Sequence, residues 1–380
     1  MHKDTKLISA LQDNAENKGH VNGPIYQAST LIFENVAELK NAKQQYGRTG
    51  TQTVAALEDE VANLEQGHKA LIYPSGLAAI TSALLAFLKP QDEIVIIKQA
   101  YEPTREFCDN YLAQKNIKIT YCPSDIGANI GDYISAQTKI IYLESPASIT
   151  FQIQDIAAIV KIAKQKNILV FFDNTWSASH CFKPIEHGAD ISIQALTKYP
   201  VGHSDVLLGS VTCKNAEQYK ILFAQYKLFG THVSSQDCYI ASRGLKTLAV
   251  RLQKHGENAQ KLAKYLQQRD EVEQVIAPFV SSHPQYKLWQ KYFTKAQGLI
   301  SFTLKKDFQS EAKIHKFIDS LKLFHLGYSW GGYESLVMFY EFKQGNEIIG
   351  DNQYLIRLHV GLEDAADLEA DLNDAFREIS

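Results

Sequence analysis

Residues 190–205 read DISIQALTKYPVGHSD, an apolar run that a polar pair, Thr197 and Lys198, interrupts shortly before a proline and a glycine. A lysine at the end of an apolar strand costs desolvation free energy unless it has a partner. The same desolvation makes its amine easier to deprotonate. The stretch therefore predicts a strand that ends in a lysine able to act as a neutral amine.

Outward from this stretch, the chain alternates between helical patterns and short β-branched or aromatic runs, from residue 57 to about residue 245. That alternation is typical of an α/β fold in which helices cover a mostly parallel sheet. The sequence predicts strands within 69–76, 92–99, 117–122, 138–146, 168–176 and 191–197. It predicts helices within 57–67, 77–89, 101–116 and 154–167.

The pattern changes near residue 245, where residues 243–268 carry leucine and alanine at three- or four-residue steps, as in a long amphipathic helix. Later segments predict a smaller α+β arrangement, with strands in 298–305 and 354–361 and helices in 310–321 and 364–379. Residues 1–50 show few periodic signals and many turn residues. We therefore expect three parts: an N-terminal arm (1–50), an α/β domain (51–245) and an α+β domain (246–380).

Composition excludes several classes of protein. Hydrophobic residues make up 45% and charged residues 21%, as in ordinary globular proteins, and the net charge of -3 disfavours nucleic acid as a partner. The cysteines never form a C-x-x-C pair, so we expect buried free thiols at Cys108, Cys122, Cys181, Cys213 and Cys238. The N-terminus lacks a signal-peptide pattern and no stretch is apolar enough to span a membrane, so we expect a cytoplasmic protein without a membrane partner.

Two other features suggest a hydrolase and a metal site, and the sequence around each gives little support. The sequence GYSWG at 327–331 fits a hydrolase nucleophile elbow, with Asp351 or Glu363 and His359 as possible triad partners. The residues after this motif make a poor helix start, and too little chain remains for a hydrolase sheet. The neighbouring polar residues His180, His187, His203 and Asp205 do not have the spacing of a metal site, and no Walker or G-x-G-x-x-G motif occurs.

A set of polar residues at predicted strand ends suits one cofactor. Asp173 ends the strand ILVFFD, and Lys198 follows ISIQALT. A neutral lysine and a carboxylate are what pyridoxal phosphate requires, for its Schiff base and its pyridine nitrogen. The segment 73–79 reads as a strand, a Ser-Gly turn and a helix start, and the N-terminus of that helix could bind the phosphate. Thr197 could add a hydroxyl group to this phosphate site. Tyr101 offers a ring to stack on the pyridine.

Ordered motifs then carry a resemblance along nearly the whole chain. They are GPIYQAST, YGRTGTQT, AYEP, LESPASIT, DNTW, SIQALTKY, GHSD, SRGLKTL, YSWGGYESL and LIRLHVGLED. The chain resembles the pyridoxal-phosphate enzymes of cysteine and methionine metabolism. The resemblance implies a large PLP-dependent transferase-like domain (fold type I) with a mostly parallel sheet, a smaller C-terminal α+β domain and an N-terminal arm.

By this resemblance, Lys198 carries the Schiff base and moves protons in catalysis. Asp173 pairs with the pyridine nitrogen, while Tyr101 stacks on the ring and keeps substrate and lysine aligned. Two residues depart from the family pattern around the lysine: Leu196 stands where the family has a small residue, and Pro200 where it has an aliphatic or aromatic one.

The resemblance also implies how the phosphate is held. Gly76, Leu77 and Thr197 would bind it from within the subunit. Tyr46 and Arg48 match residues that reach the phosphate of a neighbouring subunit, which gives the N-terminal arm a role. We therefore expect two chains to build each site jointly and two such dimers to pair into a homotetramer.

For the substrate, Arg357 matches the arginine that binds the α-carboxylate with its planar donors. Ser329 and Trp330 match residues beside that carboxylate, and Tyr46 would also contact the substrate. The implied reaction is α,β-elimination of a sulfur amino acid, for L-cystathionine giving homocysteine, pyruvate and ammonia. The sequences AYEP and YSWGG favour this reaction over γ-elimination, and activity on L-cysteine remains a further alternative.

Overall fold

The computed structural model describes residues 2–9, 19–42 and 44–380. Its larger sheet has seven strands in the order β1-β7-β6-β5-β4-β2-β3. Their bounds are β1 Lys69–Tyr73, β2 Glu93–Ile97, β3 Lys118–Cys122, β4 Thr138–Glu144, β5 Leu169–Asp173, β6 Ile191–Gln194 and β7 Gly209–Cys213. All neighbouring pairs are parallel except those that β7 makes with β1 and β6. The predicted α/β class with a mostly parallel sheet is confirmed.

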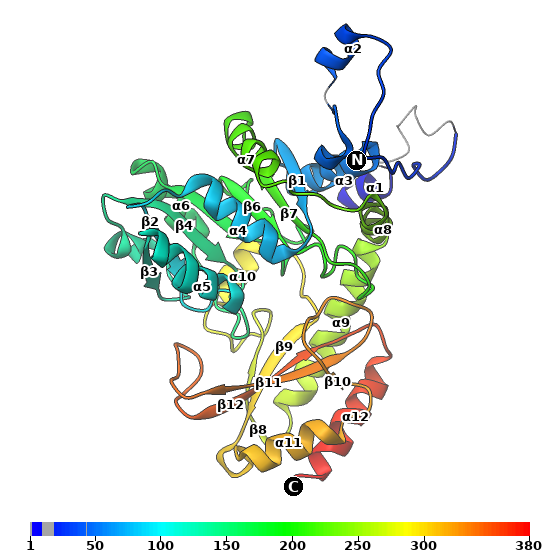
Figure 1. The fold of residues 1–380 in the computed structure, drawn as a ribbon. Helices are drawn as coiled ribbons and strands as arrows, with labels where there is room; N and C mark the ends of the chain where they lie inside the picture. The colour runs from blue at the N-terminus through cyan, green and yellow to red at the C-terminus, as the bar shows by residue number, and fades with distance from the viewer. Residues whose placement is uncertain (1, 10–18, 43) are drawn as a thin grey trace.

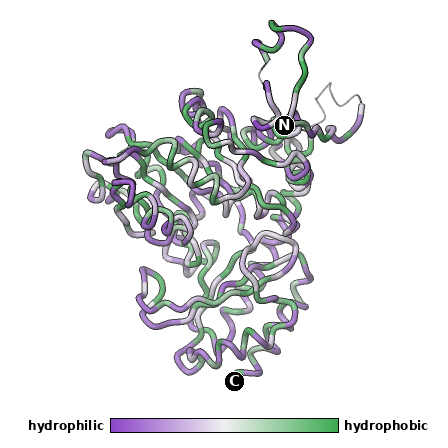
Figure 2. Tube along the Cα trace, in the orientation of Figure 1, coloured by the Kyte–Doolittle hydropathy of each residue, from purple (hydrophilic) through white to green (hydrophobic). Residues whose placement is uncertain are grey.

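Helices cover this sheet, as Figure 1 shows. They are α3 Gln52–Glu65, α4 Gly76–Phe87, α5 Glu102–Phe107, α6 Ile156–Gln165, α7 Ala216–Leu228 and α8 Ser235–Lys246. Because both faces of the sheet are covered, its central strands are apolar on both sides, as in the EIVII of β2, in which every residue is buried. Hydrophobic segments accordingly gather in the interior of Figure 2.

The second sheet has five strands in the order β10-β11-β12-β9-β8. The strands are β8 Val272–Ile276, β9 Leu299–Leu304, β10 His325–Leu326, β11 Leu336–Phe342 and β12 Gln353–His359. Helices α9 (Leu248–Gln267), α11 (Glu311–Ser320) and α12 (Ala365–Arg377) pack with it around Phe302, Phe317 and Phe376, and α10 spans Tyr286–Tyr292. Two sheets with largely separate cores support the predicted domain division near residue 245, which we keep as a proposal.

Three local predictions differ from the structure. The helix expected to run through 243–268 is interrupted at Thr247, between α8 and α9. The run 101–116 is α5 followed by a π-helical turn and a 3-10 turn. The run 191–197 stops being a strand at Gln194, so Lys198 lies in the turn beyond β6 and not at the strand's last residue.

The N-terminal segment contains α1 (Lys3–Ser9) and α2 (Val36–Asn41). Figure 1 shows α2 on a long loop that projects away from both sheets. Ile32 is 93% exposed in this loop, and the loop rejoins the body through the bridge between Thr30 and Tyr46. All five cysteines are buried thiols, as predicted. Among the described helices, none combines the length and the hydropathy that crossing a bilayer requires.

Candidate active site

Lys198 lies where the two sheets meet. Its Nζ donates to Ser329 Oγ at 2.7 Å and stands 5.5 Å from the centre of the Trp330 ring, so the segment before β11 supplies its polar partner. Burial lowers the pKa of Lys198 to about 8, and the positive charge of Arg357 acts in the same direction. The amine is therefore much easier to deprotonate than an ordinary lysine, as the sequence predicted.

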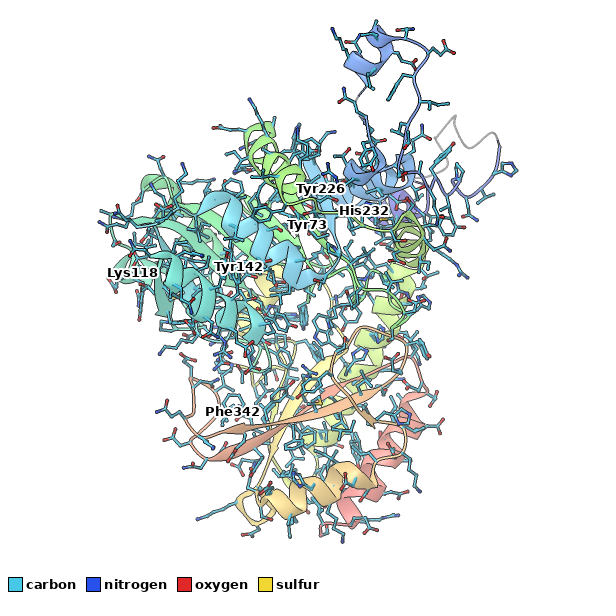
Figure 3. All side chains as sticks on the ribbon, in the orientation of Figure 1. Tyr73, Lys118, Tyr142, Tyr226, His232 and Phe342 are labelled. Atoms are coloured by element: carbon cyan, nitrogen blue, oxygen red, sulfur yellow. The ribbon has the colours of Figure 1, made fainter. Side chains whose placement is uncertain are left out.

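Asp173 is the last residue of β5 and is buried. Its Oδ1 accepts from the Thr175 N–H at 3.0 Å and from Thr175 Oγ1 at 2.6 Å, and its Oδ2 accepts from the Tyr142 hydroxyl at 3.3 Å. Tyr142 lies inside the body that carries the larger sheet (Figure 3). Burial raises the pKa of Asp173, while these bonds and the nearby Lys198 oppose the rise. The carboxylate is thus fixed in orientation by three donors.

A second carboxyl group, Glu144, stands beside Asp173 because the two residues are register partners at the ends of β4 and β5. Glu144 accepts from the Tyr101 N–H at 2.7 Å and so fixes the start of α5. Burial and the neighbouring Asp173 raise the pKa of Glu144 well above its usual range. Glu144 was not predicted as a site residue, although the sequence LESP contained it.

The N-terminus of α4 forms a potential anion site next to Lys198. Ser75 caps the helix by accepting from the Ala78 N–H at 3.1 Å, and the first N–H groups of a helix, here those of Gly76 and Leu77, have no intrahelical partner. A Cβ at Gly76 would lie 2.6 Å from Ala195 Cβ, so a glycine is needed where α4 approaches the end of β6. The predicted phosphate position therefore has free backbone donors.

The hydroxyl of Thr197 is less available than predicted. It donates to Leu208 O at 3.1 Å and accepts from the Leu208 N–H at 3.0 Å. Donating to a phosphate would require this hydrogen to turn away from Leu208. The two departures from the family pattern have structural roles: Leu196 is in the core, and Pro200 O accepts from Arg251 Nη2 at 3.3 Å.

Arg357, on β12, is a buried cation with spare hydrogen-bonding capacity. Its Nη2 donates to Ser329 O at 3.2 Å, and its guanidinium carbon lies 5.5 Å from the centre of the Tyr340 ring. Within the described part of the chain, Arg357 has no carboxylate in ion-pair range, and its buried Nε has no hydrogen-bond partner. A buried guanidinium in this state suits an anionic ligand such as a carboxylate.

Tyr101 and the N-terminal residues differ in their relation to this cluster. Tyr101 immediately precedes α5 and is 45% exposed, and burial together with nearby carboxylates, Asp173 first, raises its pKa. Tyr46 and Arg48 are exposed, and Arg48 Nη1 donates to Lys227 O at 3.3 Å, at the end of α7. Neither has a hydrogen bond to Lys198 or Arg357 within this chain.

The structure does not support the hydrolase and metal-site readings of the sequence. Ser329 bonds Lys198, whereas His359 Nε2 accepts from the Gly331 N–H at 3.0 Å, so no serine–histidine bond of a hydrolase triad is formed. Over the described residues, no three His, Cys, Asp or Glu side chains gather in a way that could hold a metal ion.

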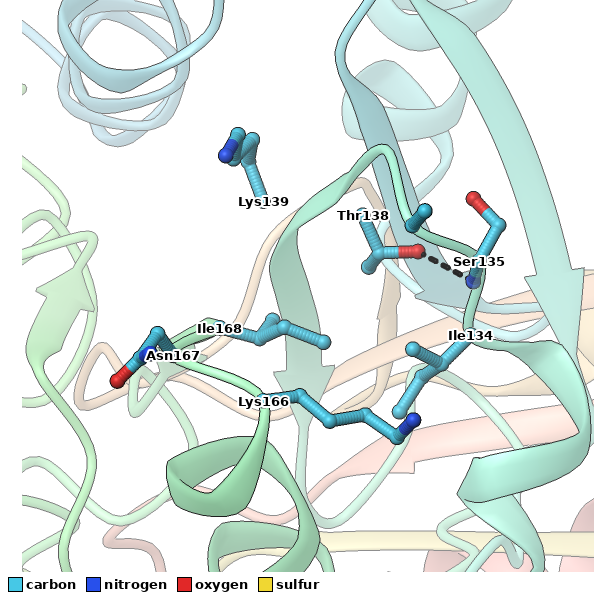
Figure 4. A pocket seen from close by; sticks show the side chains of 8 residues that line it. Ile134, Ser135, Thr138, Lys139, Lys166, Asn167 and Ile168 are labelled. Atoms are coloured by element: carbon cyan, nitrogen blue, oxygen red, sulfur yellow. Dashed lines mark hydrogen bonds between the residues drawn. The ribbon is translucent and has the colours of Figure 1, made fainter.

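A cavity of about 560 Å³ lies at the amino-terminal ends of two strands of the larger sheet, β4 and β5, on the side opposite to Glu144 and Asp173 (Figure 4). It is lined by Ile134, Ser135, Ala136, Thr138, Lys139, Lys166, Asn167 and Ile168. These residues precede or begin strands β4 and β5, whereas Glu144 and Asp173 end them. Ligand sites of open α/β sheets lie at the carboxyl ends of the strands, so we do not place the active site in this cavity.

The arrangement at the carboxyl ends fits pyridoxal phosphate. Lys198 provides an amine of lowered pKa, Asp173 a fixed carboxylate, and α4 free donors for a phosphate. The guanidinium of Arg357, whose Nε has no hydrogen-bond partner among the described residues, can bind the carboxylate of an amino acid. Fold and site together define a pyridoxal-phosphate-dependent enzyme that acts on amino acids.

Comparisons with known proteins agree with this class. The family model described as "Cys/Met metabolism PLP-dependent enzyme" matches residues 4–377. The chain is 38% identical to cystathionine β-lyase MetC of Escherichia coli strain K12, over 99% of this chain and 98% of the relative. It is 34% identical to the L-alanine/L-glutamate racemase of Wolbachia pipientis wMel, over 100% and 98%.

A solved structure agrees as well. The crystal structure of cystathionine γ-lyase from Lactobacillus plantarum, complexed with L-serine, superposes with a TM-score of 0.92 at 30% identity, covering 100% of this chain and 99% of the other. The chain belongs to the Cys/Met metabolism PLP-dependent enzyme family. The family and the relatives named as lyases make it a PLP-dependent carbon–sulfur lyase.

Proposed function

We propose that the protein catalyses α,β-elimination of L-cystathionine, giving homocysteine, pyruvate and ammonia. The observation that carries this proposal is the full-length similarity to cystathionine β-lyases, 38% and 39% identical, in a chain whose lysine, carboxylate and arginine stand together as the reaction needs. The similarity supports the substrate class, and the geometry supports the chemistry.

In this proposal residues of the body that carries the larger sheet hold the cofactor. Lys198 would bond it covalently, Asp173 would pair with its pyridine nitrogen, and Tyr101 would stack on its ring. The free N–H groups of Gly76 and Leu77 at the start of α4 would bind its phosphate. Thr197 joins them only if its hydroxyl hydrogen leaves Leu208 O.

Pyridoxal phosphate supplies the aldehyde that takes up the substrate's amino group and a ring that accepts the electrons of the broken C–H bond. Lys198 Nζ removes the proton from the α-carbon and then delivers it to the departing sulfur. Arg357 binds the α-carboxylate, and Ser329 Oγ, 2.7 Å from Nζ, holds the amine in line with the α-carbon. Trp330 limits the space around both.

We also propose that two chains share each site. The projecting loop that carries α2 rejoins the body at the bridge of Tyr46 with Thr30, close to Arg48; Tyr46 and Arg48 are exposed, and Arg48 donates to Lys227 O at the end of α7. Reaching a neighbour's phosphate and substrate would satisfy both residues. Pairing of such dimers into a homotetramer and a cytoplasmic location remain predictions.

Two other activities are supported by particular relatives. A solved γ-lyase superposes on the whole chain, which keeps γ-elimination open, and L-cysteine could satisfy the same contacts. The racemase relative keeps racemisation open, because the first step, removal of the α-proton, is shared. What decides between them is where the proton and electrons go after that step.

Product analysis tests the proposal. Purified holoenzyme is incubated with L-cystathionine, and separately with L-cysteine and with L-alanine. Pyruvate and homocysteine as the main products, at a kcat/KM above that for L-cysteine, would support β-elimination of cystathionine. Formation of 2-oxobutyrate and cysteine would replace the proposal by γ-elimination, and D-alanine formation faster than cystathionine cleavage would replace it by racemisation.

A further inference from the structure

The segment that carries Ser329 has a strained backbone. Ser329 has φ +84° and Gly331 φ +90°, so a non-glycine residue stands in a left-handed conformation directly at the site. A Cβ on Gly331 would come within 2.7 Å of Tyr199 N and 3.0 Å of Lys198 Cα. The segment therefore lies against the backbone of the catalytic lysine, and strain of this kind persists only where the surroundings fix it.

His359 is one of the groups that fix it. This histidine is 1% exposed, and its Nε2 accepts from the Gly331 N–H at 3.0 Å. Gly332 O lies 3.1 Å from the same Nε2 and could accept a hydrogen from it, so these contacts allow the ring hydrogen on either nitrogen. Only the ring with its hydrogen on Nδ1 accepts from the Gly331 N–H, because a backbone N–H can only donate. Among the described residues, that buried Nδ1 has no hydrogen-bond partner. With its hydrogen on Nδ1, His359 has an unused donor.

His255, on α9, is complementary to it. The ring is completely buried, and Nδ1 lies 2.7 Å from Val360 O. A carbonyl oxygen can only accept, so the hydrogen is on Nδ1 and Nε2 presents a lone pair. This Nε2 also has no partner in the described part of the chain. The centres of the two rings are 5.2 Å apart, so an unused donor and an unused acceptor stand side by side.

We propose that His359 carries its hydrogen on Nδ1 and that His255 and His359 form a hydrogen-bonded pair, directly or through one water, that locks the strained segment 329–332 and thereby positions Ser329 on Lys198. The chain of bonds runs from Val360 O through both rings to the Gly331 N–H. Ser329 then offers Oγ to Lys198 and its carbonyl to Arg357. Both histidines are positioning residues, since neither touches the reacting atoms.

The surroundings keep both rings neutral, which the pair requires. Burial lowers the pKa of His255 to about 4, and Arg251 adds to the effect. Burial also holds the pKa of His359 well below its usual range, with His255, Arg357 and Lys198 contributing and the contact with Gly332 O opposing them. The ring of Tyr199 packs against both, with centres 5.2 Å and 6.1 Å away, and its oxygen accepts from the Gly298 N–H at 2.9 Å.

Neutron diffraction of holoenzyme crystals tests the bond arrangement directly. We expect a deuteron on Nδ1 of both rings and none on either Nε2. A deuteron on Nε2 of His359 would overturn the proposal, because the Gly331 N–H would then face a donor. This measurement does not depend on which amino acid the enzyme cleaves, so it fails or succeeds apart from the proposed function.

The rate at which the enzyme exchanges the α-proton of L-alanine in D₂O, divided by the amount of bound cofactor, tests whether the histidine pair positions Lys198. This test assumes that Lys198 transfers the proton, but it does not depend on elimination. We expect His359→Leu to slow exchange about 10- to 100-fold with little change in KM, as for a misplaced reacting group. His359→Gln places an acceptor near Nε2 and should recover most of the rate. Wild-type exchange in His359→Leu would overturn the proposal, and if that variant does not fold, normal exchange in His255→Leu would do so.

A double-variant comparison separates a pair from two independent residues. His255→Asn keeps a donor for Val360 O but loses the acceptor towards His359. If the two act together, adding His255→Asn to His359→Leu should slow exchange no further. Multiplying effects would refute the pairing. His283→Leu is the matched control, because His283 is another buried histidine with a pKa lowered to about 4 by burial. It should lose stability without slowing exchange.

Discussion

Replacing Arg357 by alanine should weaken substrate binding by an amount that the structure allows us to state. The side chain is buried, makes one bond to Ser329 O, and leaves Nε free for a ligand. Charge-assisted hydrogen bonds contribute about 1.5–3 kcal/mol. Losing the carboxylate contact should therefore raise KM about 10- to 150-fold.

The same substitution should change the titration of the lysine. Arg357 lowers the pKa of Lys198, so its removal should raise that pKa above about 8. The rate at which apoenzyme recombines with pyridoxal phosphate follows the neutral fraction of Lys198. The midpoint of its pH dependence should accordingly move to higher pH in the variant.

Steady-state kinetics with L-cystathionine and stopped-flow recombination measure the two effects. Arg269→Ala is a suitable control, because Arg269 is a partly buried arginine paired with Glu271 at 2.7 Å in the turn between α9 and β8. It should leave KM and the recombination midpoint unchanged. An Arg357→Ala enzyme with wild-type KM would refute the assignment of the carboxylate site, and an unmoved midpoint would refute the electrostatic coupling to Lys198.

Three further predictions concern the cofactor, the shared site and acid stability. Lys198→Ala should fold normally, as judged by circular dichroism, yet lack the absorbance band of lysine-bound cofactor; an unchanged band would contradict the role of Lys198. Arg48→Ala should weaken cofactor binding and change the oligomer seen in light scattering; fully active monomers would argue against a shared site. The contribution of each of His255 and His283 to stability should fall by roughly 1.4 kcal/mol per pH unit as pH drops from about 6.5 towards 4, because the unfolded chain takes up protons that the buried rings refuse. Urea unfolding of the wild type and of His283→Leu at several pH values checks this for His283, and a difference in stability between the two that stays constant across this range would disprove it.

Much of the larger sheet could be predicted, because buried parallel strands are nearly continuous apolar runs such as IIYLE and LVFFD. Strand β7 was missed because GSVTC is short and has no alternation, and α7 because its sequence has only a weak apolar face. The structure confirmed the predicted fold class. The boundary between α8 and α9 could not be predicted, because the leucine pattern continues through the break at Thr247.

In the candidate site, too, some residues could be predicted from the sequence and others could not. Lys198 and Asp173 could be found because each interrupts or ends an apolar run. Glu144 could not, since its place beside Asp173 depends on the register of β4 with β5. The approach of His255 to His359 joins residues more than a hundred positions apart and depends on how α9 packs on the second sheet, which no local pattern encodes.

The division of labour between the two sheets has a consequence for adapting the enzyme. In the proposed mechanism the proton-transfer group, Lys198, comes from one layer and the carboxylate-binding residue, Arg357, from the other, so their spacing is set along the seam where Tyr199 packs against Trp330. Engineering that seeks to accept longer or shorter amino acids can therefore work on this seam, while thermal tolerance is improved separately inside either core.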